Sequence, residues 1–304
     1  MTQRHTSPPP PPPATLRFPG RDAMTLDRPR IMGVLNVTPD SFSDGGQYHT
    51  HTAAVQRGLA MAQQGADLID VGGESSRPGA ARVDASEQTR RTRAVIAQLR
   101  DALDRAGFEA TAISIDTTRA PVAEAALGAG ASMLNDISGG REDPAILELA
   151  ARRGVPIVLM HMRGTPADMQ HRPRYGHVVD EVEAFLKHQT DTARRAGIDP
   201  TQVLLDPGIG FGKTVEHNLA LLRALPRLVA LGQPVLLGTS RKSFLGKLLG
   251  DASAHVEPAP GGGTAATTAL GVHAGVGLFR VHDVALNRQA ADVAHRLLGV
   301  PGRE

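Results

Sequence analysis

Eight short apolar runs recur along the chain, and each is followed by a longer segment with helical periodicity. The runs are rich in Val, Ile and Leu, show little alternation, and cover residues 31–37, 67–71, 112–115, 132–134, 155–160, 202–205, 234–237 and 276–281. Runs of this kind are typical of parallel strands that are buried on both faces. Eight strands alternating with helices favour an α/β fold with a single closed (β/α)8 TIM barrel. The alternative is a doubly wound open sheet, but no G-x-G-x-x-G opens a helix after the first run.

The segments between the runs carry helix signals of their own. Asp84, three residues ahead of Glu87, is expected to cap a helix that extends towards Gly107. Asp283 is expected to cap the last helix. An apolar stripe at helical spacing predicts which face of that last helix is buried, and it consists of Leu286, Ala290, Val293 and Leu297.

The N-terminal segment has a different composition from the rest. Six consecutive prolines occupy residues 8–13, and such a run favours polyproline II rather than a packed core. We therefore expect a disordered Pro-rich tail over residues 1–27 and one barrel domain over residues 28–304.

Composition excludes several classes of function. The 33 basic and 31 acidic residues leave a net charge of +2, too balanced for a general nucleic-acid binder or a polybasic membrane surface. Cysteine is absent, which excludes disulfides, thiol nucleophiles and Cys-ligated metals, so a metal would need O or N ligands. No stretch of about 18 uninterrupted apolar residues and no signal-peptide pattern occurs, so a cytoplasmic location and small-molecule partners are expected.

Charged side chains gather just after the apolar runs, at the end of the barrel where enzymes of this fold place their active sites. The cationic set suits a phosphate or pyrophosphate, because arginine offers a bidentate fork and lysine a point charge. It consists of Arg77, Lys242, Arg280 and His282, and Ser76 can add a hydroxyl donor. A single strand-end polar residue often serves only to cap the next helix, but a ring of caps does not require four cationic side chains.

A second set of strand-end residues suits a ring with N–H donors and acceptors. Asp116, Asn135 and Asp206 offer the carboxylate and amide groups that such a heterocycle needs. Asn36 is a weak metal ligand alone, and it would need phosphate oxygens and waters to complete a Mg2+ shell. The residues together predict a neutral heterocycle with an attached pyrophosphate as the ligand.

The motifs around these residues resemble those of dihydropteroate synthase, a pterin-binding TIM-barrel family. The matching segments, in order, are MGVLNVTPDSFSDGG at 32–46, DVGGESSRPG at 70–79, SIDT at 114–117, LND at 134–136, LMHM at 159–162, LDPGIGFGK at 205–213, SRKS at 240–243 and RVHD at 280–283. The resemblance implies a transferase of folate biosynthesis that condenses 6-hydroxymethyl-7,8-dihydropterin diphosphate with 4-aminobenzoate, giving 7,8-dihydropteroate and pyrophosphate. It also implies a homodimer and a sulfonamide target.

The resemblance assigns three groups of binding residues. Those implied for the pterin are Asp116, Asn135, Met160, Asp206, Phe211 and Lys242. Those implied for the diphosphate are Asn36, Ser76, Arg77, Arg280 and His282, with Asn36 also on Mg2+. Those implied for 4-aminobenzoate are Phe42, Pro78 and Ser240. The implied mechanism is dissociative and Mg2+-assisted, with Lys242, Arg280, Asp116 and Asp206 as the catalytic set.

Two departures and two rival functions accompany this interpretation. Ser76 stands where the family usually has Thr, and the segment 258–264 replaces a Glu-Arg pair that often precedes Gly-Thr. One rival is a pterin-dependent methyltransferase, which would share the ring-binding acids but would not need the pyrophosphate cations. The other is a catalytically weak paralogue that acts as a binding subunit. His161 is expected to be a hydrogen-bonded strand-end residue rather than a ligand.

Overall fold

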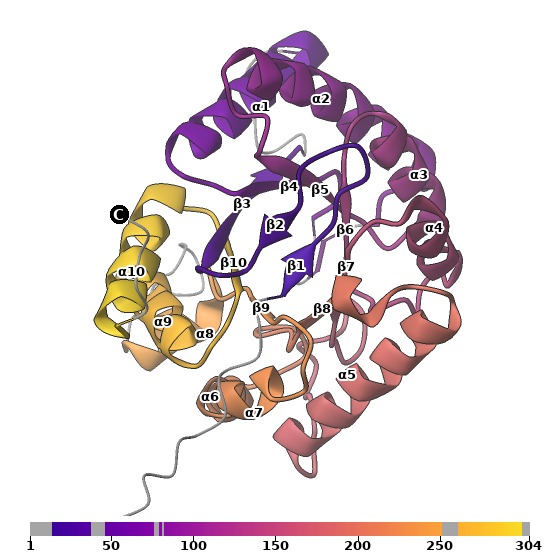
Figure 1. Cartoon of the computed structure of the whole chain (residues 1–304). Coiled ribbons are helices and arrows are strands. Elements are labelled where there is room, and N and C mark those ends of the chain that lie inside the picture. The colour runs from indigo at the N-terminus through magenta and orange to yellow at the C-terminus, as the bar shows by residue number, and fades with distance from the viewer. Residues whose placement is uncertain (1–13, 38–45, 76–78, 81, 251–260, 300–304) are drawn as a thin grey trace, which may run out of the picture.

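The computed structural model describes residues 14–37, 46–75, 79–80, 82–250 and 261–299, and its centre is a barrel of parallel strands (Figure 1). The strands are β3 (Arg30–Asn36), β4 (Leu68–Gly72), β5 (Ala112–Asp116), β6 (Met133–Asp136), β7 (Ile157–Met160), β8 (Val203–Asp206), β9 (Leu236–Leu237) and β10 (Leu278–Val281). They pair in the order β8-β7-β6-β5-β4-β3-β10-β9. A parallel bridge between Leu205 and Val235 joins the two ends of this sheet. The expected (β/α)8 barrel is confirmed.

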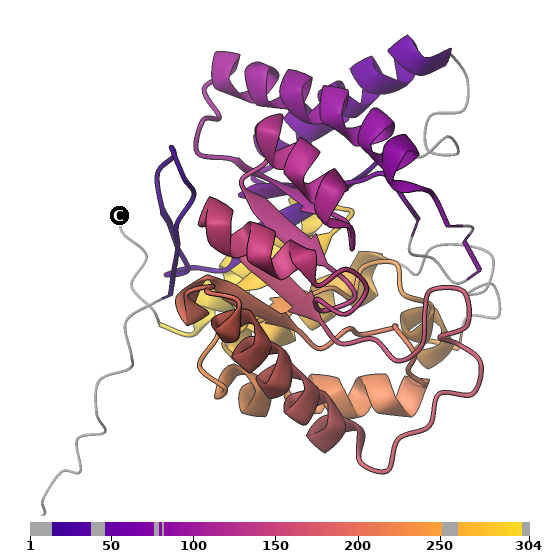
Figure 2. The ribbon, with the colours of Figure 1, turned by 90° about the vertical axis from the view of Figure 1, so that its right-hand side faces the viewer.

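Helices surround the strands on the outside of the barrel (Figure 2). They are α1 (Gly46–Gln63), α2 (Ala85–Arg105), α3 (Ala120–Gly128), α4 (Ala145–Arg153), α5 (Val178–Arg195), α6 (Val215–Arg223), α7 (Leu225–Val229), α8 (Ser243–Leu248), α9 (Gly261–His273) and α10 (Val284–Leu297), with a 3-10 turn η2 (Pro200–Gln202). Both predicted caps are confirmed, since Asp84 accepts from the Glu87 N–H at 2.9 Å and Asp283 from the Leu286 N–H at 3.1 Å. Within the described ranges, no helix is both long and apolar enough to span a bilayer.

The predicted disordered tail over residues 1–27 is wrong for its second half. Residues Thr15–Leu16 (β1) and Met24–Thr25 (β2) form an antiparallel hairpin, and Leu16 and Phe18 are buried. Figure 2 shows this hairpin at the left, at the end of the barrel opposite to the loops that follow the strands. Residues 1–13, with the proline run, lie outside the described residues.

The hairpin is ordered because it covers an apolar layer at the end of the barrel where the strands begin. Each of the eight strands contributes one buried side chain to this layer, and these are Met32, Leu68, Ala112, Met133, Val158, Leu204, Leu236 and Leu278. Burying such a layer stabilises the fold by removing apolar surface from water. Leu16, Phe18 and Met24 of the hairpin segment complete this cluster.

The predicted buried face of the last helix is wrong for its C-terminal half, whereas Leu286 and Ala290 are half-buried. In α10 the buried residues are Val284, Asn287 and Ala291, while Val293 and Leu297 are 59% and 82% exposed. The face is set by packing against α9, where the Thr268 hydroxyl donates to Oδ1 of Asn287 at 2.7 Å. The buried face of α10 therefore includes a hydrogen-bonded polar residue, Asn287, which hydrophobic periodicity alone does not predict.

Candidate active site

Polar side chains from several strands meet at the C-terminal end of the barrel, around the guanidinium of Arg280. Arg280 Nε donates to Asp70 Oδ2 at 2.7 Å, and Arg280 Nη2 donates to Asp116 Oδ2 at 2.7 Å. Arg280 lies on β10, whereas the two carboxylates lie on β4 and β5. The structure therefore brings together two of the predicted residues, and it adds Asp70 to them.

Asp70 is the residue that the sequence analysis missed. It is fully buried in β4 and accepts hydrogen bonds from Ser114 Oγ at 2.6 Å and Asn135 Nδ2 at 2.9 Å, in addition to Arg280. A carboxylate in the middle of an apolar strand was the available signal, because a buried charge needs partners. One carboxylate thus orients both Arg280 and Asn135, and it leaves Oδ1 of Asn135 to accept from a ligand.

Asp116 and Asp206 are buried carboxyls with raised pKa values. Burial raises the pKa of Asp116 to about 7, against the lowering effect of Arg280. Burial raises the pKa of Asp206 to about 6, and its Oδ1 accepts from the Gly208 N–H at 2.6 Å. Burial also raises the pKa of the neighbouring Asp136 to about 6, but this carboxyl accepts from the N–H groups of Ser138 and Gly140, both at 2.7 Å, and so shapes a loop.

Lys242 and Phe211 form a cation–π contact at the same end. Lys242 Nζ lies 3.7 Å from the centroid of the Phe211 ring, and burial lowers the pKa of Lys242 to about 8. Phe211 packs with Met160, Met162 and Met169 in a small cluster apart from the main core. The structure places Met160 and Phe211 at the strand ends, as an apolar wall beside the charged groups.

Ser240 and His282 lie together after β9 and β10. Ser240 Oγ is 3.0 Å from His282 Nδ1 and accepts from the His282 N–H at 3.1 Å. Asn36 ends β3, and its Oδ1 faces Gly72, where an added Cβ would lie 3.5 Å away. Ser76, Arg77, Phe42 and Pro78 lie outside the described residues, as do residues 258–260 of the departing segment, and α9 begins at Gly261.

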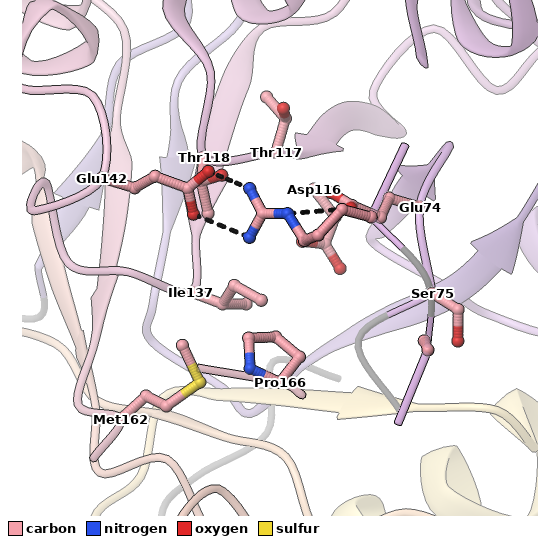
Figure 3. Close-up of a pocket in the computed structure, with 11 residues that line it drawn as sticks. Glu74, Ser75, Asp116, Thr117, Thr118, Ile137, Glu142, Met162 and Pro166 are labelled. Carbon is pink, nitrogen blue, oxygen red and sulfur yellow. Dashed lines mark hydrogen bonds and ion pairs between the residues drawn. The ribbon is translucent and has the colours of Figure 1, made fainter. Parts of the chain in front are cut away.

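A small pocket, partly open to solvent, is lined by Asp116 among other residues. Arg82 spans its edge: Nη1 donates to Glu142 Oε2 at 3.1 Å, and Nε lies 3.3 Å from Glu74 Oε1. Figure 3 shows Ile137, Met162 and Pro166 below these ion pairs. The pocket therefore has apolar side chains on one side and ion pairs on the other, and Asp116 connects it to the predicted pterin residues.

Both the sequence and the fold of this chain are similar to those of known proteins. The family described as "pterin binding enzyme" matches residues 32–282. A dihydropteroate synthase of Mycobacterium leprae is 49% identical over 273 residues, which is 89% of this chain and 94% of that protein.

Solved structures give the same answer. A Xanthomonas albilineans dihydropteroate synthase with 4-aminobenzoic acid is 45% identical to this chain, with a TM-score of 0.85. The match covers 95% of this chain and 100% of that one. The same enzyme in complex with 7,8-dihydropteroate is 43% identical with a TM-score of 0.81, over 94% of this chain and 100% of that one. The chain therefore belongs to the dihydropteroate synthase family of pterin-binding enzymes, which are transferases of folate synthesis.

Proposed function

We propose that this chain condenses 6-hydroxymethyl-7,8-dihydropterin diphosphate with 4-aminobenzoate by a dissociative route. The observation that carries the proposal is Arg280, held between the Asp70 and Asp116 carboxylates at the strand ends. With Nε and Nη2 engaged in this way, Nη1 is left to donate to an anion. The family membership and the two ligand complexes of the Xanthomonas enzyme support the choice of substrates.

The pterin ring binds through groups that the fold has already oriented. The carboxylates of Asp116 and Asp206 accept from ring N–H and amino groups, and Oδ1 of Asn135 accepts another hydrogen bond. Phe211 and Met160 cover the ring. The ammonium of Lys242 donates to the ring from its position over Phe211.

The chemistry then needs charge stabilisation rather than a nucleophilic side chain. The bond between the pterin methylene and the diphosphate oxygen breaks, and the electron pair leaves with pyrophosphate. Arg280 and His282 stabilise the leaving anion, while Asp116 and Asp206 stabilise the methylene cation. The amino nitrogen of 4-aminobenzoate attacks the methylene carbon and loses a proton, giving 7,8-dihydropteroate.

The described residues fit Mg2+ only as an ion that arrives with the diphosphate. They contain no group of three or more His, Asp or Glu side chains with metal-binding geometry, whereas Asn36 offers one amide oxygen at the end of β3. Mg2+ prefers substrate phosphates and waters with one or two protein oxygens. When bound, the ion would neutralise charge on the leaving pyrophosphate.

The experiment follows pyrophosphate release and dihydropteroate formation with purified protein, both substrates and Mg2+. Turnover that requires the diphosphate, with no methyl transfer from a methylated folate, supports the synthase. Folded protein that binds the pterin but releases no pyrophosphate would instead indicate a binding subunit. A cytoplasmic location stays a prediction of the sequence, which cell fractionation tests.

We propose that the arylamine binds beside Ser240, next to the predicted diphosphate residue His282. Ser240 Oγ lies 3.0 Å from His282 Nδ1. This contact supports the placement, because the attacking amine must reach the carbon from which the diphosphate leaves. Sulfonamides should then compete with 4-aminobenzoate in steady-state assays. Inhibition that is non-competitive with 4-aminobenzoate would contradict this pocket.

We also propose that the chain is a homodimer. Leu270 of α9 is 66% exposed, and Val293 and Leu297 are exposed on the adjacent α10. Large apolar side chains gathered on neighbouring helices are typical of a surface that another subunit covers. Light scattering should give twice the chain mass for the parent and a smaller mass for Leu297→Glu, and a monomeric parent would contradict the proposal.

A further inference from the structure

The loop between β8 and α6 determines where the ammonium of Lys242 lies. Phe211 in this loop provides the ring beneath Lys242 Nζ. Gly210 lies against the Lys242 side chain, since an added Cβ there would be 2.9 Å from Lys242 Cδ. A displacement of this loop would therefore move both Phe211 and Lys242.

Lys213 is buried behind the same loop, with 3% exposure. Its Nζ donates to the carbonyl oxygens of Gly208 at 2.9 Å, Phe211 at 3.0 Å and His161 at 3.3 Å, and it lies 3.0 Å from His161 Nδ1. Burial lowers the pKa of His161 to about 2, so its ring stays neutral and can accept. The lysine thus ties two loop carbonyls to the residue that follows β7.

The loop is fitted closely to the chain after β7. An added Cβ at Gly208 would lie 1.8 Å from the carbonyl oxygen of His161, and one at Gly212 would lie 2.4 Å from that of Arg163. Only glycine allows this approach, and both positions have positive φ. Because the backbones are so close, the carbonyls that face Lys213 have little room to turn towards other donors.

Lys213 has no role in the reaction proposed above. Within the described residues, no ion pair closer than 4.0 Å involves its Nζ; burial lowers the pKa of Lys213 to about 7, and the charge of Asp206 opposes that lowering. A buried ammonium that donates hydrogen bonds to several backbone carbonyls holds that backbone in place.

We propose that Lys213 is a positioning residue for pterin binding: its ammonium fixes the loop that carries Phe211, and thereby sets the place of Lys242. This inference rests on the proposed function, since it concerns the same pterin site. Lys213 acts through the loop and does not touch the substrate. Its loss should therefore weaken pterin binding selectively.

The test compares Lys213→Met with Lys187→Met. Lys187 is an exposed lysine on α5 that pairs with Glu183, so it provides the same substitution away from the site. In Lys213→Met the KM for the pterin diphosphate should rise about tenfold or more, while the KM for 4-aminobenzoate stays within about twofold. Lys187→Met should match the parent in both KM values. Amide hydrogen exchange in the peptide 206–214 should be faster in Lys213→Met only.

Lys213→Gln provides a second variant, because it keeps two N–H donors and should recover part of the lost affinity. An unchanged pterin KM, or an equal rise in both KM values, would overturn the inference. Global unfolding of both Lys213 variants would also overturn it, because Lys213 would then stabilise the barrel as a whole. Failure of the proposed function is separate, since it would show as a parent protein without turnover.

Discussion

Replacing Asp70 by Asn tests whether one buried carboxylate organises the active site. The substitution keeps the shape of the side chain and removes its charge. Asp70 Oδ2 accepts from both Arg280 and Asn135, while Oδ1 accepts from Ser114 Oγ. The serine hydroxyl can rotate and accept from the new amide N–H, so the main loss falls on Arg280, which keeps Asp116 as its only carboxylate.

The magnitude follows from the hydrogen bonds that are weakened. A hydrogen bond to a charged group contributes about 1.5–3 kcal/mol, and the amide oxygen of Asn retains part of it. We therefore expect a loss of about 2 kcal/mol in transition-state stabilisation, or roughly 30-fold in kcat/KM for the pterin diphosphate. The charge of Asp70 raises the pKa of Asp116, so its removal should shift the acid limb of the kcat/KM profile to lower pH.

The assay measures pyrophosphate release against pH, together with thermal unfolding. Asp67→Asn is a matched control, because Asp67 is also buried and bonded to arginines, but it lies just before the N-terminal end of β4. The control should lower the Tm and leave kcat/KM within about twofold. An Asp70→Asn variant within about threefold of the parent, or a control that loses as much activity, would refute the reasoning.

Three further predictions follow from the site and the core. Arg280→Ala should weaken binding of the pterin diphosphate by about 100-fold and of the bare pterin much less, and equal losses in calorimetric titrations would count against the anion role. Affinity for the bare pterin should fall as the pH drops from about 7 through about 6, because Asp116 and then Asp206 become protonated and lose their acceptor charge, and a flat calorimetric profile between pH 5 and 8 would disagree. Phe18→Ala should lower the free energy of unfolding by about 3 kcal/mol in denaturant titrations with both KM values unchanged, and an unchanged midpoint would contradict the role of the hairpin.

The order of elements could be predicted because strand burial leaves a local record in the sequence. The run 202–205 becomes β8 (Val203–Asp206) and the run 276–281 becomes β10 (Leu278–Val281), each within two residues. The polar residues that follow these runs then fall at one end of the barrel, since parallel strands share a direction. For the same reason Asp116, Asn135, Asp206 and Arg280 could be predicted to lie at the same end of the barrel without coordinates.

Packing decided what local patterns could not. Leu297 follows the apolar spacing of α10 yet is exposed, while Asn287 is buried because Thr268 of α9 provides its partner. Leu16 and Phe18 follow a proline run yet are buried, because the apolar layer at the end of the barrel where the strands begin needs a cover. In both cases the deciding contact comes from a distant part of the chain.

The sequence by itself determined the barrel, the end of it that carries the chemistry, and the family to which the motifs belong. Only the tertiary structure decided which polar groups touch. Arg280 and Asp70 are 210 positions apart and meet across the barrel interior, and Lys213 reaches His161 from 52 positions away. Hydrophobic periodicity is a property of neighbouring residues, whereas the pairing of buried charges depends on strand register and on closure of the whole barrel.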